Sequence, residues 1–275
     1  MVPDADARGE PKQTLETMGV HSSWARHFRT SENDPFYNAA FDYIDEVFGR
    51  ARGATVVDAG CGSATKTLHL LRRGYRVRGL DFSAAVLEQA RAAVAAAGQG
   101  DNVTFETADL TALTLPDASV DRMVCWGVMM HIPDVEKVVV ELSRVLAPGG
   151  VLVVSEGNVR SLQAAGLRAV KTLLGKERAE LVRRPPGLEF WEQTDTGRLM
   201  TRQADVPWLI AAFEAQGLRL DTRRAGQFSE LYTLLPWKPA RQLVHAINGL
   251  WFRAIRAGGP AFGNLLVLRK PAVPR

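Results

Sequence analysis

Three acidic residues recur at intervals beside a loop that contains glycine. Asp58, Asp81 and Asp109 each stand at or just after the end of a short apolar run, and the loop after the first run reads Asp58-Ala59-Gly60-Cys61-Gly62. Glycine permits a tight turn and a close approach of the backbone to a ligand. An acid about twenty residues after such a loop can accept hydrogen bonds from ribose hydroxyls, and a later one can accept from an exocyclic amine such as that of adenine. The pattern predicts an adenosine site.

Alternating strands and helices would position these residues. Strands are predicted at 55–57, 76–80, 103–105, 120–126, 151–154, 218–224 and 264–268, with helices at 63–73, 83–98, 135–146 and 205–216. This alternation indicates a largely parallel sheet with right-handed crossovers. Ligands of such sheets bind beyond the carboxyl ends of the strands, so the loop after the first strand is the expected site.

Two stretches interrupt the alternation, at about 158–203 and 228–259. We expect them to form helical insertions that cap the sheet. Residues 1–12 are polar and contain proline and glycine, so we expect a disordered tail followed by a single domain at 13–275, with its cofactor-binding core at 50–157.

Composition narrows the class of protein. There is no run of eighteen apolar residues that could span a bilayer, and two cysteines, Cys61 and Cys125, argue for a reducing, cytoplasmic setting. Residues 1–157 carry 15 Lys and Arg against 21 Asp and Glu, whereas residues 158–275 carry 19 against 9. The basic half indicates an anionic substrate, a membrane surface, nucleic acid or simply a solvated surface.

Four motifs together resemble those of class I S-adenosylmethionine (SAM)-dependent methyltransferases, over roughly residues 54–156. They are V-V-D-A-G-C-G-S-A, G-L-D-F, A-D-L and L-A-P-G-G-V-L-V-V. Their spacing is similar to that of the small-molecule branch, which includes quinone and natural-product methyltransferases. The resemblance implies an α/β fold, a Rossmann-like doubly wound sheet of seven strands that is mostly parallel with an antiparallel last strand.

The resemblance also implies the cofactor, SAM, which leaves as S-adenosylhomocysteine. Asp81 would hold the ribose hydroxyls, Asp109 and Leu110 would frame the adenine, and Phe82 would pack on the base. Ala64 stands at the third glycine position of the family's loop. The cofactor residues predicted in this way are Asp58, Ala59, Gly60, Cys61, Gly62, Asp81, Phe82, Asp109, Leu110, Trp126 and Gly127.

Methyl transfer from a sulfonium requires chiefly that acceptor and methyl be held in line, which can supply roughly 7–11 kcal/mol. Cys125 follows Val124, so the Pro-Cys nucleophile of cytosine-C5 enzymes is missing. The segment 126–129, Trp-Gly-Val-Met, resembles neither the Asn/Asp-Pro-Pro-aromatic motif of base-amine enzymes nor the Asp of metal-dependent catechol enzymes. We therefore expect a small-molecule acceptor, no nucleic acid and no metal.

The resemblance implies that the insertions at about 158–203 and 228–259 form a cap over the acceptor, which the sequence defines less sharply. His131 could act as a general base because imidazole titrates near neutral pH, although the same residue could be structural. Aromatic residues of the insertions could line the pocket or pack in the core, and arginines could bind an anionic acceptor or lie on a solvated surface. The candidate acceptor residues are Trp24, Tyr37, Arg160, Trp191, Arg198, Arg202 and Tyr232.

Residues 239–256 predict an amphipathic helix. Its apolar face consists of Leu243, Val244, Ile247, Leu250, Trp251 and Ile255, and basic and polar residues lie opposite. Such a face can pack on the protein's own core, form a dimer contact or make a peripheral contact with a membrane, the last suited to a lipid or quinone acceptor.

Two rival functions share parts of this pattern. The glycine loop and Asp81 also suit NAD, so an NAD-dependent oxidoreductase is an alternative, although Thr65 replaces the third glycine of G-x-G-x-x-G. A non-catalytic nucleotide- or RNA-binding module is the other alternative, but no motif of the known RNA modules is present. The acceptor, its reacting atom and the oligomeric state are not specified by these residues.

Overall fold

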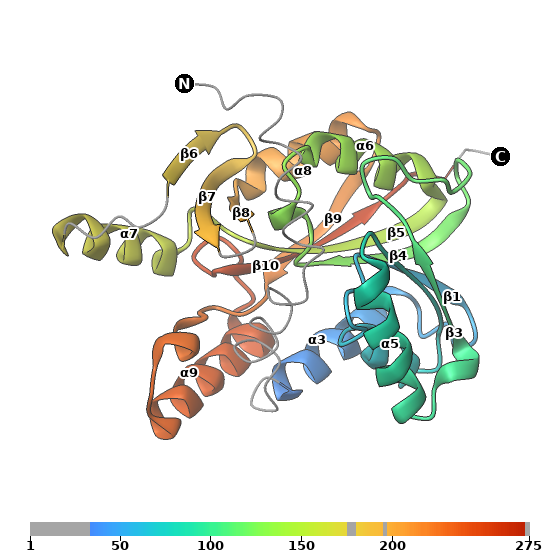
Figure 1. Ribbon diagram of the computed structural model, residues 1–275, viewed down its shortest axis with the longest axis horizontal. Coiled ribbons are helices and arrows are strands. Elements are labelled where there is room, and N and C mark those ends of the chain that lie inside the picture. The colour runs from blue at the N-terminus through green and yellow to red at the C-terminus, as the bar shows by residue number, and fades with distance from the viewer. Residues whose placement is uncertain (1–33, 175–179, 195–196, 273–275) are drawn as a thin grey trace.

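The computed structural model describes residues 34–174, 180–194 and 197–272. A mixed seven-stranded sheet forms its centre (Figure 1). The strand order is β3-β2-β1-β4-β5-β10-β9, and β10 runs antiparallel to both of its neighbours. The predicted fold is therefore confirmed, including the antiparallel last strand. The seven strands are β1 (Thr55–Ala59), β2 (Arg76–Asp81), β3 (Val103–Thr107), β4 (Val120–Trp126), β5 (Leu146–Gly157), β9 (Arg219–Ala225) and β10 (Gly263–Arg269).

Helices cover both faces of the sheet, and alternate residues of each strand serve two separate cores. On β5, Leu152 and Val154 pack with helices α6 and α8, whereas Val151 and Val153 pack with the core of α3, α4 and α5. Strands buried on both faces read as continuous apolar runs, which is why they were predictable. The helices are α3 (Asp34–Val47), α4 (Thr67–Leu71), α5 (Ala84–Ala96), α6 (Val135–Val145), α7 (Leu162–Leu174), α8 (Val206–Ala215) and α9 (Lys238–Leu250).

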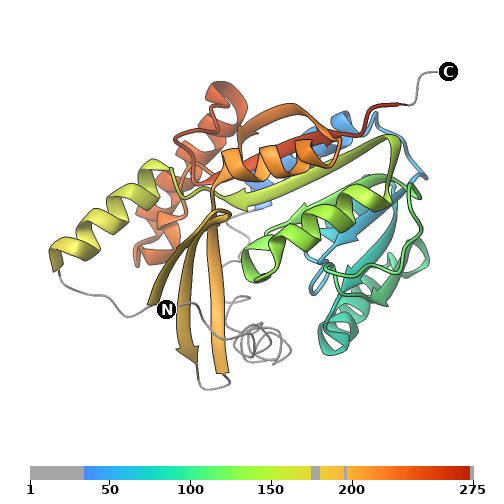
Figure 2. The same ribbon diagram turned by 90° about the horizontal axis from the view of Figure 1, so that it is seen from above.

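The first insertion combines helix α7 with a three-stranded antiparallel sheet of β6 (Glu180–Arg184), β7 (Gly187–Thr194) and β8 (Gly197–Ala204). These strands extend away from the main sheet (Figure 2). The helical insertion that the sequence predicts is thus only partly helical. Gly187 follows Pro185-Pro186 at the turn, and a Cβ there would lie 2.1 Å from the carbonyl oxygen of Gln203, so the close approach of β7 to β8 requires glycine.

A buried arginine, Arg202, makes contacts both within this small sheet and with the rest of the molecule. Arg202 and Glu189 are each 2% exposed, and Nη2 of Arg202 donates to Oε1 of Glu189 at 2.7 Å. The same guanidinium donates to the carbonyl oxygens of Ile132 and Pro133, at 2.8 and 3.0 Å. Arg202 therefore holds the segment after β4, which includes the short helix η4 (Met129–His131).

We predict that Arg202→Met lowers the free energy of unfolding by about 3–5 kcal/mol, because it leaves a buried carboxylate without its closest cation. Arg160→Met is the matched control, since Arg160 is 63% exposed where it pairs with Asp205, and exposed pairs contribute about 0–1 kcal/mol. Urea denaturation monitored by fluorescence measures both. Equal effects of the two substitutions would contradict the structural role of Arg202.

Candidate functional site

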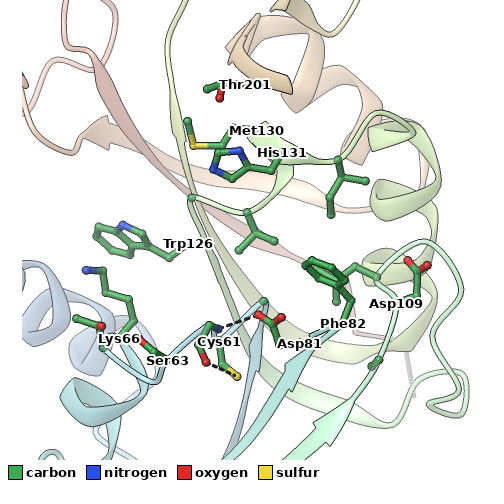
Figure 3. A pocket seen from close by; sticks show the side chains of 18 of the residues that line it. Cys61, Ser63, Lys66, Asp81, Phe82, Asp109, Trp126, Met130, His131 and Thr201 are labelled. Carbon is green, nitrogen blue, oxygen red and sulfur yellow. Dashed lines mark hydrogen bonds between the residues drawn. The ribbon is translucent and has the colours of Figure 1, made fainter. Parts of the chain in front are cut away.

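A cavity of about 570 Å³ lies at the carboxyl ends of β1, β2 and β4 (Figure 3). The strand order reverses beside β1, which is where ligands of open α/β sheets bind. The described residues that line it are Tyr37, Gly60, Cys61, Gly62, Ser63, Thr65, Lys66, Asp81, Phe82, Ala108, Asp109, Leu110, Thr111, Trp126, Gly127, Val128, Met130, His131, Ile132, Pro133, Asp134, Thr201 and Glu230.

The loop after β1 forms one end of the cavity. The backbone N–H groups of Gly60 and Cys61 both donate to the carbonyl oxygen of Leu80, at 2.7 and 2.9 Å. Gly60 has a φ of 78°, and a Cβ there would lie 2.4 Å from the side chain of Val128. Ala64 also has a positive φ, 64°, so the departure from glycine at this position is accommodated with backbone strain.

Asp81 binds this loop to the end of β2. Its Oδ2 accepts from the N–H of Gly62 at 2.8 Å (Figure 3). Its Oδ1 accepts from the N–H of Ser83 at 3.1 Å. Ser83 in turn caps helix α5, because its hydroxyl oxygen accepts from the N–H of Val86. Each carboxylate oxygen can accept more than one hydrogen bond, so Asp81 can fix the loop and also accept from a ribose hydroxyl in the cavity.

Asp109 and Phe82 stand together at the other end of the cavity (Figure 3). Oδ1 of Asp109 accepts from the N–H of Thr111 at 2.9 Å and from its hydroxyl at 2.7 Å, which fixes the carboxylate after β3. A ring face and a carboxylate at the end opposite the glycine loop suit a base with an exocyclic amine.

All the predicted cofactor residues line the cavity except Asp58 and Ala59. Asp58 is buried, its Oδ2 accepts from the hydroxyl of Thr67 at 2.7 Å, and burial raises its pKa to about 6. Its position differs from the prediction because the carboxylate points into the protein. It connects the end of β1 to α4 and thereby supports the loop from behind.

An aromatic cluster closes the cavity beside the glycine loop. The rings of Trp126 and Phe41 stack with centroids 5.4 Å apart, and Tyr37 meets Trp126 edge-on at 5.9 Å. Nζ of Lys66 lies 3.2 Å from the centre of the Tyr37 ring. Lys66 was not predicted, although it stands only four residues after Gly62.

A third side of the cavity is formed by Met130, His131 and Thr201 (Figure 3). Helix η4, which carries two of them, is held by two buried polar side chains: the guanidinium of Arg202 and the carboxyl group of Glu156. Oε1 of Glu156 accepts from the N–H of Met129 at 2.9 Å, and burial raises the pKa of Glu156 to about 8. Nδ1 of His131 lies 3.4 Å from the carbonyl oxygen of Met200.

Glu230 brings a carboxylate to the cavity from the second insertion. Its backbone N–H donates to Oε1 of Gln163 at 2.7 Å, and that oxygen also accepts from the hydroxyl of Ser229 at 2.8 Å. Burial raises the pKa of Glu230 to about 7. Nothing local in the sequence indicated Glu230, because only the fold brings residue 230 to the ends of β1 and β4.

Most predicted acceptor residues lie elsewhere than the cavity wall. Tyr37 is the one that lines it, and Trp24 is outside the described residues. Arg160 pairs with Asp205, Arg198 with Glu180, and Arg202 with Glu189. Trp191 donates to Glu189 at 3.1 Å, and Tyr232 donates to Gln227 at 3.3 Å, so both are buried in structural contacts.

The lining charges are therefore mostly negative. Among the described residues, Lys66 is the one lysine or arginine of the wall, against the carboxylates of Asp81, Asp109, Asp134 and Glu230. This arrangement suits a cofactor that carries a sulfonium and an ammonium. It offers little to a carboxylate or phosphate on the acceptor. Within the same part of the chain, no group of three or more His, Cys, Asp or Glu could hold a metal ion.

Residues 57–154 match the family model described as "Methyltransferase domain". The methyltransferase GfsG of Streptomyces halstedii is 31% identical over 198 residues, which cover 67% of this chain and 70% of that one. A ubiquinone biosynthesis O-methyltransferase of Cupriavidus pinatubonensis is 35% identical over 122 residues, 44% of this chain and 48% of that one. The chain thus spans about half or less of several relatives that it matches.

Solved structures show the same fold. A SAM-dependent methyltransferase of Clostridium acetobutylicum aligns over 92% of this chain and 98% of its own, with a TM-score of 0.60 and 11% identity. A geranyl diphosphate C-methyltransferase of Streptomyces coelicolor, solved with S-adenosylhomocysteine, aligns over 84% and 77%, with a TM-score of 0.53 and 16% identity. The chain belongs to the class I SAM-dependent methyltransferases of the small-molecule type, and SAM is its cofactor.

We predict that Asp81→Asn weakens binding of S-adenosylhomocysteine by roughly 10- to 100-fold, because the amide has one acceptor oxygen for both the loop and the ribose. Isothermal calorimetry measures the affinity. Asp121→Asn is the control, since Asp121 is an exposed carboxylate on β4. An unchanged affinity in Asp81→Asn, with the fold intact by circular dichroism, would contradict the assignment.

Proposed function

We propose that the protein transfers the methyl group of SAM to a small, neutral and amphipathic acceptor, at an atom that gives up a proton during the reaction. The observation that carries the proposal is the composition of the cavity wall. Apolar and aromatic side chains, including Tyr37, Trp126 and Met130, share the wall with Glu230. The side chain of Glu230 is partly buried.

SAM, when bound, supplies a methyl group on a good leaving group, so the acceptor's lone pair displaces S-adenosylhomocysteine in one in-line step. The protein's own contribution is to hold the acceptor in line and to exclude water. Tyr37 and Trp126 would cover the acceptor beside the glycine loop. Glu230 would take the acceptor's proton, which an ionised carboxylate does best when its pKa is near the working pH. His131, which also lines the wall, is a second candidate for the base.

The mostly negative wall favours a neutral acceptor over the anionic one that the basic half of the sequence also allowed. Arg160, Arg198 and Arg202 are engaged by carboxylates away from the cavity, which removes the basis for an anionic acceptor. The match to a ubiquinone biosynthesis O-methyltransferase supports an amphipathic acceptor with a reacting hydroxyl. Family membership argues against the NAD-dependent alternative.

The proposal is tested with SAM that carries a deuterated methyl group. The protein is incubated with this SAM and a small-molecule extract of the organism that encodes it, and mass spectrometry identifies the labelled product. A labelled small molecule that depends on the protein supports methyl transfer. The absence of any labelled product across neutral and apolar fractions, with SAM binding intact, would reject it.

We predict that, with the acceptor so identified, kcat/KM rises with pH until about pH 7 and then levels off, because only ionised Glu230 accepts a proton. Glu230→Gln should lower kcat by about 10²-fold or more and remove this rise, with the affinity for S-adenosylhomocysteine unchanged. His131→Gln is the matched comparison. Loss of the rise in His131→Gln and its retention in Glu230→Gln would instead assign the base to His131.

A second measurement needs no acceptor. A carboxyl whose pKa is raised by folding keeps its proton in the folded state while the unfolded chain loses it, so stability falls as pH rises from the unfolded pKa towards the folded one. For Glu230 this window runs from the ordinary value of 4.5 to about 7. Glu230→Gln should flatten that decline in the free energy of unfolding, and an unchanged decline would show that the carboxyl is not buried.

A further inference from the structure

Helix α9 turns its apolar face outward. The exposed apolar side chains, called here the α9 patch, come from the short helix η5 (Leu231–Leu234), from residue 237 just before α9, from α9 itself and from the π-helical turn η6 (Trp251–Ile255). Trp237 is 73% exposed and Leu243 is 63% exposed, which is unusual for side chains of this size. The α9 patch consists of Leu234, Trp237, Leu243, Ile247, Leu250 and Ile255.

Hydrogen bonds on the opposite side of the helix fix this orientation. Asn248 is fully buried, its Oδ1 accepts from the N–H of Ser229 at 2.9 Å, and its Nδ2 donates to the carbonyl oxygen of Ser229 at 2.8 Å. A rotation of the helix that buried Leu243 and Leu250 would break both hydrogen bonds between Asn248 and Ser229. The helix therefore presents its apolar face to the surroundings as a consequence of specific contacts.

The charges on the segment that carries the α9 patch are of one sign. Residues 231–275 contain no Asp or Glu, and Lys238, Arg253 and Arg256 are exposed on or beside the helix. Contact with a second copy across a two-fold axis would bring these like charges together at the rim. An apolar face flanked by basic residues matches a surface with an apolar interior and negative headgroups.

The α9 patch also adjoins the acceptor side of the cavity. Glu230 lines the cavity, and η5 begins at the next residue, Leu231. Helix α9 lies beside α3, whose Tyr37 lines the same cavity (Figure 1). A surface that holds α9 would thus lie close to where the acceptor binds.

We propose that the α9 patch is a docking surface for an anionic lipid bilayer, on which α9 lies in the plane of the interface. The helix has 13 residues, and within the described chain no helix is both long and apolar enough to cross a membrane. The cavity would then receive an acceptor that partitions into the bilayer. Only this last step rests on the proposed function, because attachment to a vesicle requires no methyl transfer.

Co-sedimentation with vesicles tests the proposal. At low ionic strength, we predict binding to vesicles of phosphatidylcholine mixed with phosphatidylglycerol, and roughly tenfold weaker binding to phosphatidylcholine alone. Salt should release the bound protein, because the electrostatic part is screened. Failure to bind the anionic vesicles at low ionic strength, or equal binding to both kinds of vesicle, would overturn the proposal.

Two pairs of variants locate the contact. The double variant Leu243→Ser, Leu250→Ser should abolish vesicle binding. The control double variant Val140→Ser, Leu181→Ser should leave it unchanged, because these two side chains, each 43% exposed, lie outside the α9 patch. Lys238→Glu with Arg253→Glu should weaken binding by roughly tenfold or more, and Arg183→Glu with Arg219→Glu, exposed on β6 and β9, should have little effect.

Affinity for S-adenosylhomocysteine, measured on the same variants, should remain that of the unchanged protein, which separates a failed docking surface from a failed cofactor site. Sedimentation velocity tests the other possible occupant of the α9 patch, which is a second copy of the protein. A dimer that forms with rising concentration and is lost in Leu243→Ser with Leu250→Ser would show that the α9 patch is a self-contact and would overturn the membrane assignment.

Discussion

The carboxylate of Asp81 is the constraint on which the cofactor end of the site depends. It accepts from the N–H of Gly62 on one side and of Ser83 on the other, so the bend after β1 and the start of α5 are fixed by one side chain. Gly60 makes the bend possible because no Cβ fits beside Val128. The cavity therefore opens at the point of the sheet where an adenosine can reach both the loop and the acid.

The cofactor half was predictable because its determinants are local in sequence. A β-branched run, a glycine loop and an acid at the next strand end are each set within a few residues, and the parallel sheet then brings them together. Asp58 illustrates the limit. Its spacing is that of a ligand contact, yet its carboxylate turns inward to Thr67, and only the packing of α4 on β1 decides that direction.

The acceptor half could not be predicted in the same way because residue type does not reveal burial. Arg202 looks like a surface or ligand-binding arginine, but it occupies an inward position of β8 and is satisfied by Glu189 and carbonyl groups of the segment after β4. Glu230, by contrast, lies in an irregular stretch without a motif. Its place in the cavity comes from contacts with Gln163, which is 67 residues away in the chain.

The fold alone does not decide what a methyltransferase-like cavity does. The chemistry therefore has to be argued from the wall of the cavity. Here the same insertion that carries Glu230 to the wall also continues into η5 and α9, and the two hydrogen bonds of Asn248 hold these parts to each other. A surface that binds α9 would act on the segment that positions Glu230, and would thereby couple the access of the proposed acceptor to its deprotonation.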